Sequence, residues 1–167
     1  MSFKKSSEVI AVSGRVEESA ANTFTTQEIN LSLDPLNNEV FVVLAMDTAL
    51  SAPDYIVGTN TGSLFQLSST TQTAISGLEE PNVMLRTERL IQSPGAGESL
   101  NWEHVAGESP QAVLDYVQII ATPNFHAQIQ GSNNSNVMSC AYRVWGYRAQ
   151  ATASTYAALV QSEVLSQ

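Results

Sequence analysis

Cysteine and histidine are scarce in this sequence, which contains one cysteine, Cys140, and two histidines, His104 and His126, among 167 residues. A single cysteine excludes an intrachain disulfide and a cysteine-based zinc site. The nucleophile pattern GxSxG is missing, and the segment GAGES at 95–99 lacks the lysine of a phosphate-binding loop. We therefore predict that the protein is not an enzyme and has no catalytic residue, cofactor or metal ligand.

Charge is also scarce, because only 14% of the residues are Asp, Glu, Lys or Arg. The 7 basic residues are outnumbered by 16 acidic ones, which gives a formal net charge of −9. Binding to a nucleic-acid backbone is driven by Lys and Arg that displace counterions, so direct nucleic-acid contact is not expected. The surface must instead be mostly neutral and polar, which is typical of all-β proteins that present their surface to other subunits.

Long apolar segments are missing as well. The longest run is Val40–Met46, whereas a membrane-spanning helix needs about 20 apolar residues. No apolar stretch follows the lysines within residues 1–13, so no signal peptide is predicted. The length and the mean hydropathy of −0.05 fit one globular domain.

The sequence does contain a series of alternating segments, of which residues 136–149, NVMSCAYRVWGYRA, form the longest. Alternate side chains of a strand point to opposite faces, and one parity of this segment is predicted to face the core. This core face consists of Met138, Cys140, Tyr142 and Val144. The other parity carries Arg143, Trp145 and Tyr147, which suits a surface covered by another element or another subunit.

Two segments early in the chain also read as strands. Residues 24–33 alternate between apolar and polar side chains, which predicts a half-buried strand. The run Val40–Met46 is apolar at both parities, which predicts a strand covered on both faces. Because the sequence between them, DPLNN, favours turn geometry, we expect neighbouring strands joined by a tight turn.

The chain becomes rich in alanine after residue 150, and Tyr156, Leu159 and Val160 recur there at helical spacing. About eight strands precede this segment, and no regular strand–helix alternation indicates a parallel sheet. We predict an all-β fold, an antiparallel jelly-roll β-sandwich of about eight strands with a short C-terminal helix. Its parts are an N-terminal arm or first edge strand at 1–23, a jelly-roll domain at 24–150 and the helix at 151–167.

Three other kinds of site are possible if side chains that are distant in the sequence come together in the fold. His104, Glu103 and His126 could form a cupin-like metal site if their strands converge. Acidic side chains could supply the oxygens that calcium prefers, and the candidates are Asp47, Asp54, Glu79 and Glu80. Large aromatic side chains could form a platform for sugars, although such residues more often serve packing. The aromatic candidates are Trp102, Tyr142, Trp145 and Tyr147.

The segments EINLSLDPLNNEVFVVLAMD and NVMSCAYRVWGYRA, together with the C-terminal helix, resemble the small single jelly-roll major capsid proteins of tailless icosahedral viruses and phages. The resemblance covers about residues 24–148 and lies in size, strand order and polarity. It implies a virion structural protein, a capsid subunit that self-assembles as a homo-oligomer into an icosahedral shell. One departure is the basic arm that many of these proteins carry, because here only Lys4 and Lys5 are present.

A capsid role implies partners and contact residues. Other copies of the chain are the expected partners, and a second capsid protein and a nearby internal membrane are further possible partners. The expected location is the virion, assembled in the host cytoplasm. The residues predicted to contact neighbours are Trp145, Tyr147, Tyr156, Leu159 and Val160; alternatively, the helix packs on its own sheet. The other function considered is a jelly-roll carbohydrate- or receptor-binding module, such as a spike or fibre head.

Overall fold

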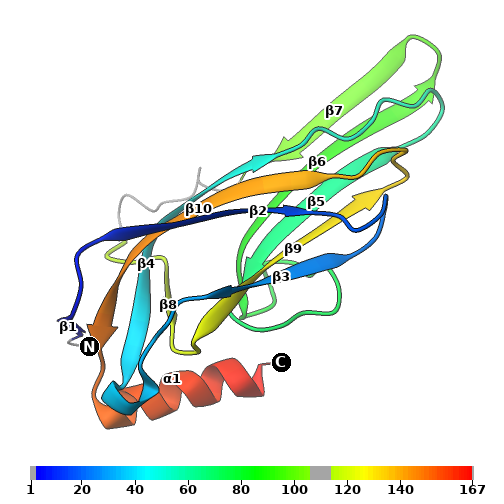
Figure 1. Cartoon of the computed structure of the whole chain (residues 1–167). Helices are drawn as coiled ribbons and strands as arrows, with labels where there is room; N and C mark the ends of the chain where they lie inside the picture. The colour runs from blue at the N-terminus through cyan, green and yellow to red at the C-terminus, as the bar shows by residue number, and fades with distance from the viewer. Residues whose placement is uncertain (1–2, 106–113, 167) are drawn as a thin grey trace.

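The computed structural model describes residues 3–105 and 114–166, which form two facing antiparallel sheets and one C-terminal helix (Figure 1). The strands are β1 (Lys4–Lys5), β2 (Ile10–Glu17), β3 (Thr25–Asn30), β4 (Glu39–Leu50), β5 (Thr61–Ser68), β6 (Val83–Gly95), β7 (Glu98–His104), β8 (Gln118–Ile120), β9 (Asn124–Ser132) and β10 (Ser139–Gln150). A 3-10 turn, η1 (Pro35–Asn37), precedes β4, and the helix α1 (Ala153–Leu165) follows β10.

The strand pairing is that of a jelly roll. Four antiparallel pairs, β2·β10, β3·β9, β4·β8 and β5·β6, bring the two halves of the chain together like one long hairpin. Two further pairs, β4·β10 and β5·β9, roll this hairpin into two sheets. The first sheet has the order β2-β10-β4-β8, and the second has the order β3-β9-β5-β6-β7. The predicted jelly-roll sandwich is therefore confirmed, with β7 as an added edge strand.

The core lies between the two sheets and is built from the inward parity of each strand. Its largest fully buried side chains include Phe41, Phe65 and Phe125. The predicted core face of the long strand is confirmed, because Met138, Cys140, Tyr142 and Val144 are all buried. Burial of such side chains contributes about 25 cal/mol per Å² of apolar area removed from water, which makes this layer the main source of stability.

The prediction that the strands at 24–33 and 39–49 pair with each other is wrong, because β3 lies in the second sheet and β4 in the first. The connection crosses the sandwich instead of reversing in a hairpin. Leu31 and Leu33 are buried in the core cluster on the way. Asp34 then caps η1, since its side chain accepts a hydrogen bond from the Leu36 N–H at 3.0 Å.

The described part of the N-terminal segment, residues 3–23, contributes the strands β1 and β2 to the first sheet. β2 pairs along β10 from Ser139 to Gly146, and β1 pairs with the end of the same strand at Ala149 and Gln150. Both strands therefore lie on one edge of the first sheet.

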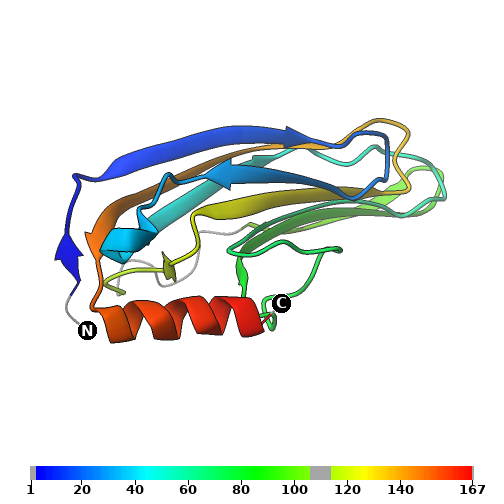
Figure 2. The ribbon, with the colours of Figure 1, turned by 60° about the horizontal axis from the view of Figure 1, so that its bottom comes forward.

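The C-terminal helix covers part of the outer face of the first sheet (Figure 2). It begins after Thr152, whose hydroxyl accepts a hydrogen bond from the Thr155 N–H at 3.3 Å. A second apolar cluster forms beneath it from Val40, Val42, Ile119, Ala121 and Ala149. The first part of the predicted doubly covered run, Val40–Val43, is consequently buried on both faces, whereas Ala45 farther along the run is only partly covered. No helix within residues 3–105 and 114–166 is long and apolar enough to cross a membrane.

Candidate assembly surfaces

The outer face of the first sheet is divided into a covered part and an open part. The covered part lies under α1, and the open part follows β2, β10 and β4 beyond it. Small residues alternate with a few larger ones on this open face, which comprises Ala11, Ser13, Arg15, Ala45, Asp47, Ala49, Ser139, Ala141, Arg143 and Trp145. A pocket lies between several of these residues and is lined in part by Ser13, Asp47 and Trp145.

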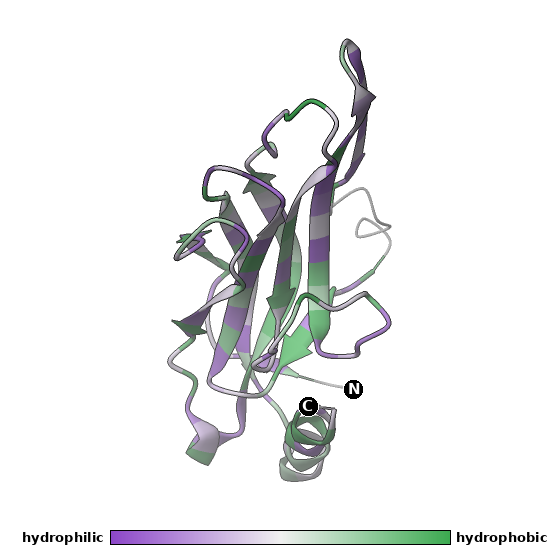
Figure 3. Ribbon diagram, turned by 90° about the vertical axis from the view of Figure 1, so that its right-hand side faces the viewer, coloured by the Kyte–Doolittle hydropathy of each residue, from purple (hydrophilic) through white to green (hydrophobic). Residues whose placement is uncertain are grey.

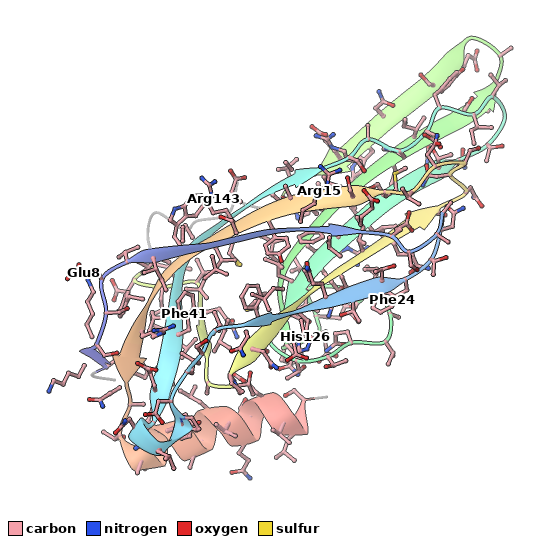
Figure 4. The ribbon with its side chains drawn as sticks, in the orientation of Figure 1. Glu8, Arg15, Phe24, Phe41, His126 and Arg143 are labelled. Carbon is pink, nitrogen blue, oxygen red and sulfur yellow. The ribbon has the colours of Figure 1, made fainter. Side chains whose placement is uncertain are left out.

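Arg143 is held in place on the open face by two contacts. Its guanidinium carbon lies 5.8 Å from the centroid of the Trp145 ring, within the range of a cation–π interaction. Its Nε donates a hydrogen bond to the Ser13 hydroxyl at 3.0 Å. Arg15 projects from the neighbouring strand β2 (Figure 4), and its Nη2 lies 3.7 Å from the Glu17 carboxylate. The open face thus presents cations that already have local partners.

The predicted contact residues do not form one group. Trp145 lies on the open face, whereas Tyr147 and the helix residues Tyr156, Leu159 and Val160 pack against the second apolar cluster of their own chain. The structure therefore supports the alternative that the helix packs on its own sheet. Contact of these residues with a neighbouring copy stays a prediction.

The hairpin β6–β7 is a surface that the sequence did not single out. All seven residues of β7 are exposed, and the hairpin extends beyond the neighbouring strands at the top of the molecule (Figure 3). Leu100 is 62% exposed and Trp102 is 49% exposed, both on the outer face of the second sheet. Trp102 lies opposite Leu90 on β6. Large apolar side chains exposed next to each other are typical of an interaction surface.

Ion pairs within the second sheet neutralise most of the charge on β6. Arg86 contacts Glu88 on the same strand at 2.7 Å, and Arg89 contacts Glu103 on β7 at 3.2 Å. A second pocket lies beside the hairpin and is lined by Ala52, Pro53, Arg89, Leu90, Ile91, Asn101, Trp102 and Glu103. The hairpin therefore combines exposed apolar side chains with polar groups that have partners.

The cupin-like site is not assembled. His104 is exposed on β7, whereas His126 is buried on β9, and β5 and β6 lie between these strands. Three strand spacings correspond to about 14 Å, which is too far for both imidazoles to bind one metal ion. His126 instead has its Nε2 at 3.2 Å from the Thr71 hydroxyl.

The acidic residues considered for calcium are also apart. Asp54 accepts hydrogen bonds from the backbone N–H groups of Ser135 and Asn136 at 2.8 and 2.9 Å, and it joins two loops in this way. Hydrogen bonds from the Asn136 side chain and backbone lower the pKa of Asp54. In the part of the chain that the structure describes, no three His, Cys, Asp or Glu residues lie close enough to hold a metal ion. The proposed oxygen cluster is therefore not formed.

The four aromatic residues considered as a sugar platform do not share one surface, although Trp145 and Tyr147 both lie on the outer side of the first sheet. Tyr142 is buried between the sheets and stacks on Phe65, with ring centroids 6.0 Å apart. Trp145 lies on the outer face of the first sheet, and Trp102 lies on the outer face of the second. These rings cannot contact one ligand together.

Comparison with known proteins gives no sequence relationship. No protein-family model matches the chain, and no curated protein matches it in sequence. Among solved structures, a chain of Desmodium yellow mottle tymovirus is similar over 88% of this chain and 91% of its own length, with 8% identity and a TM-score of 0.31. A TM-score this low supports no conclusion about function.

Proposed function

We propose that this protein is a structural subunit of a virion shell, in which copies of the chain associate through their strand edges and outer faces. The observation that carries the proposal is the jelly-roll strand order combined with the protruding hairpin β6–β7, which exposes Leu100 and Trp102. Jelly rolls are a common architecture of viral capsid proteins. Interfaces between subunits favour aromatic side chains and disfavour isolated charges.

The placement of the basic residues supports a role in protein contacts. Arg86 and Arg89 are ion-paired within the second sheet, and Lys5 lies 3.5 Å from Glu8. Partners that already neutralise these cations leave them less free to displace counterions from a nucleic acid. This placement agrees with contacts to other protein subunits and not to a genome.

The proposal is tested by the assembly state of the purified chain. Size-exclusion chromatography with light scattering and negative-stain microscopy, across salt and calcium concentrations, are expected to reveal rings, sheets or closed shells. Trp102→Ala should reduce assembly, whereas Leu36→Ala should not, because Leu36 is 92% exposed on η1, away from the hairpin. A chain that forms no higher assembly under any condition would overturn the proposal.

A second candidate function is recognition of a carbohydrate by the pocket beside the hairpin. This pocket is lined by Arg89, Asn101 and Glu103, which share one face of the hairpin and offer polar groups that suit the hydroxyls of a sugar. A glycan screen with the wild-type chain and Asn101→Ala tests this function. Binding that depends on Asn101, by a chain that does not assemble, would favour this second function.

A further inference from the structure

The outer edge of β7 is the feature from which a specific contact can be inferred. Within the described residues β7 pairs only with β6, so its other edge presents unpaired backbone groups. Proteins commonly protect such edges with Lys, Pro or a very short strand. β7 has the sequence ESLNWEH over seven residues, with no Lys, Arg or Pro. Its position on a protruding hairpin leaves room for a second strand alongside (Figure 1).

The sequence of β7 is complementary to itself in one antiparallel register. If two copies meet about a twofold axis at Asn101, each Leu100 lies opposite the partner copy's Trp102. Each Glu98 then lies opposite the partner copy's His104, and each Ser99 opposite Glu103. Apolar side chains therefore meet apolar ones, and each acidic side chain meets a hydrogen-bond donor. Cross-strand pairs of these kinds stabilise antiparallel sheets.

We propose that β7 pairs with β7 of a second copy of this chain, so that the two second sheets join into one continuous antiparallel sheet across a twofold axis. Such an interface requires a self-complementary surface, and the pairing about Asn101 provides one. The backbone hydrogen bonds fix the register, and the Leu100–Trp102 contacts remove exposed apolar area from water. The inference deepens the proposed shell function, since the pair would be a building block of the assembly, but the contact can be tested on its own.

Disulfide trapping tests the register directly. In this pairing the two Asn101 Cα atoms lie about 4.5 to 5.5 Å apart, which is compatible with a disulfide. Asn101→Cys is expected to give a covalent dimer in the presence of oxidised glutathione. Glu98→Cys is the matched control on the same exposed strand, because its two copies would be about 20 Å apart. The inference is wrong if both variants crosslink equally or if neither does.

A charge exchange provides a second test that a folding defect cannot imitate. His104→Glu places like charges opposite each other twice in the dimer, so its dissociation constant should rise roughly 5-fold or more. The double variant Glu98→Lys and His104→Glu restores opposite charges and should restore the dimer. Both variants carry the same His104→Glu change beside Glu88, so the effect of that change within the chain is common to both. Failure of the double variant to recover dimerisation would contradict the register.

The two proposals fail in different ways. Dimers that crosslink at Asn101 without forming rings or shells would retain the β7 contact and overturn the shell function. Shells that form with no crosslink at Asn101 would retain the shell function and overturn the β7 contact.

Discussion

The carboxylate of Glu163 on α1 accepts a hydrogen bond from the backbone N–H of Ala121 at 2.8 Å. Its other oxygen accepts from the N–H of Thr122 at 3.0 Å. Glu163 is buried, and these two donors follow directly after the edge strand β8. A charged side chain thus joins the C-terminal helix to the first sheet, beside the apolar contacts of the same helix.

Glu163→Gln is expected to destabilise the fold by about 1 to 3 kcal/mol, because the amide retains one acceptor and leaves one buried N–H without a partner. Urea unfolding of the wild type and the variant measures this difference. Gln161→Ala is the control, since Gln161 is exposed on the same helix. Equal losses of unfolding free energy in the two variants would show that the Glu163 hydrogen bonds do not contribute to the stability of the fold.

The same carboxyl group should change stability with pH. Burial raises the pKa of Glu163 above its ordinary value of 4.5, although the Ala121 and Thr122 hydrogen bonds oppose this. The folded chain then binds more protons than the unfolded chain between pH 4.5 and the raised pKa. The stability of the wild type relative to Glu163→Gln should therefore rise as the pH falls through this window and decline as the pH rises. Urea midpoints that differ by a constant amount across this range would contradict the prediction.

Gly146 occupies a position in β10 where no larger residue fits. A Cβ atom there would lie 2.4 Å from the Val42 carbonyl oxygen and 2.6 Å from an atom of the Phe41 ring. Gly146→Ala should consequently destabilise the protein by about 1 to 3 kcal/mol, the usual cost of overpacking a core. Thermal unfolding measures the loss. Gly95→Ala is the matched control, because a Cβ at Gly95 would meet nothing within 4 Å.

The parts of the fold that follow from local pattern could be predicted from the sequence. Cys140, Tyr142 and Val144 share one parity of this strand, and the other parity carries Arg143, so only the first parity can face the core. The half-buried character of residues 24–33 also follows from their alternation, and Leu31 and Leu33 are buried, but the pairing of this segment does not follow from local pattern. Alternation looks the same in a hairpin and in a strand that crosses to the opposite sheet. The turn sequence after Leu33 forms a 3-10 turn instead of a hairpin loop.

The candidate surfaces are harder to predict from the sequence than the core is. Leu100, Trp102 and His104 lie on one face of β7, but their exposure depends on whether another strand lies beyond it. The role of Glu163 depends on two N–H groups about forty positions earlier in the chain, at Ala121 and Thr122. Such contacts are set by the topology of the whole sandwich and not by local pattern.

His126 should make the folded state less stable in mild acid. The side chain is 6% exposed, and its Nδ1 has no hydrogen-bond partner within the described residues. Burial lowers the pKa of His126, and the negative charge of Glu28, opposite it on β3, counteracts this only in part. Between the lowered pKa and 6.5, the unfolded chain binds more protons than the folded chain. Stability should therefore fall as the pH drops below 6.5.

Urea midpoints measured between about pH 5 and pH 8 test this prediction. His126→Gln should flatten the decline in the lower part of this range. His104→Gln serves as the control, because His104 is exposed on β7. An equal decline in the wild type and in His126→Gln would assign the acid sensitivity to other groups.

Cys140 should be inert toward thiol reagents in the folded protein. It is fully buried between the sheets, and burial raises the pKa of its thiol to about 12. The thiolate is the reactive species, so at about pH 8 almost none is available, and the reagent has no access to it. Reaction with a disulfide reagent is expected only in denaturing guanidinium chloride, where the one thiol per chain should appear. Rapid reaction without denaturant would mean that the sandwich opens at β10. Such opening would expose the strand that holds β2 and β4 together and would contradict the packing described above.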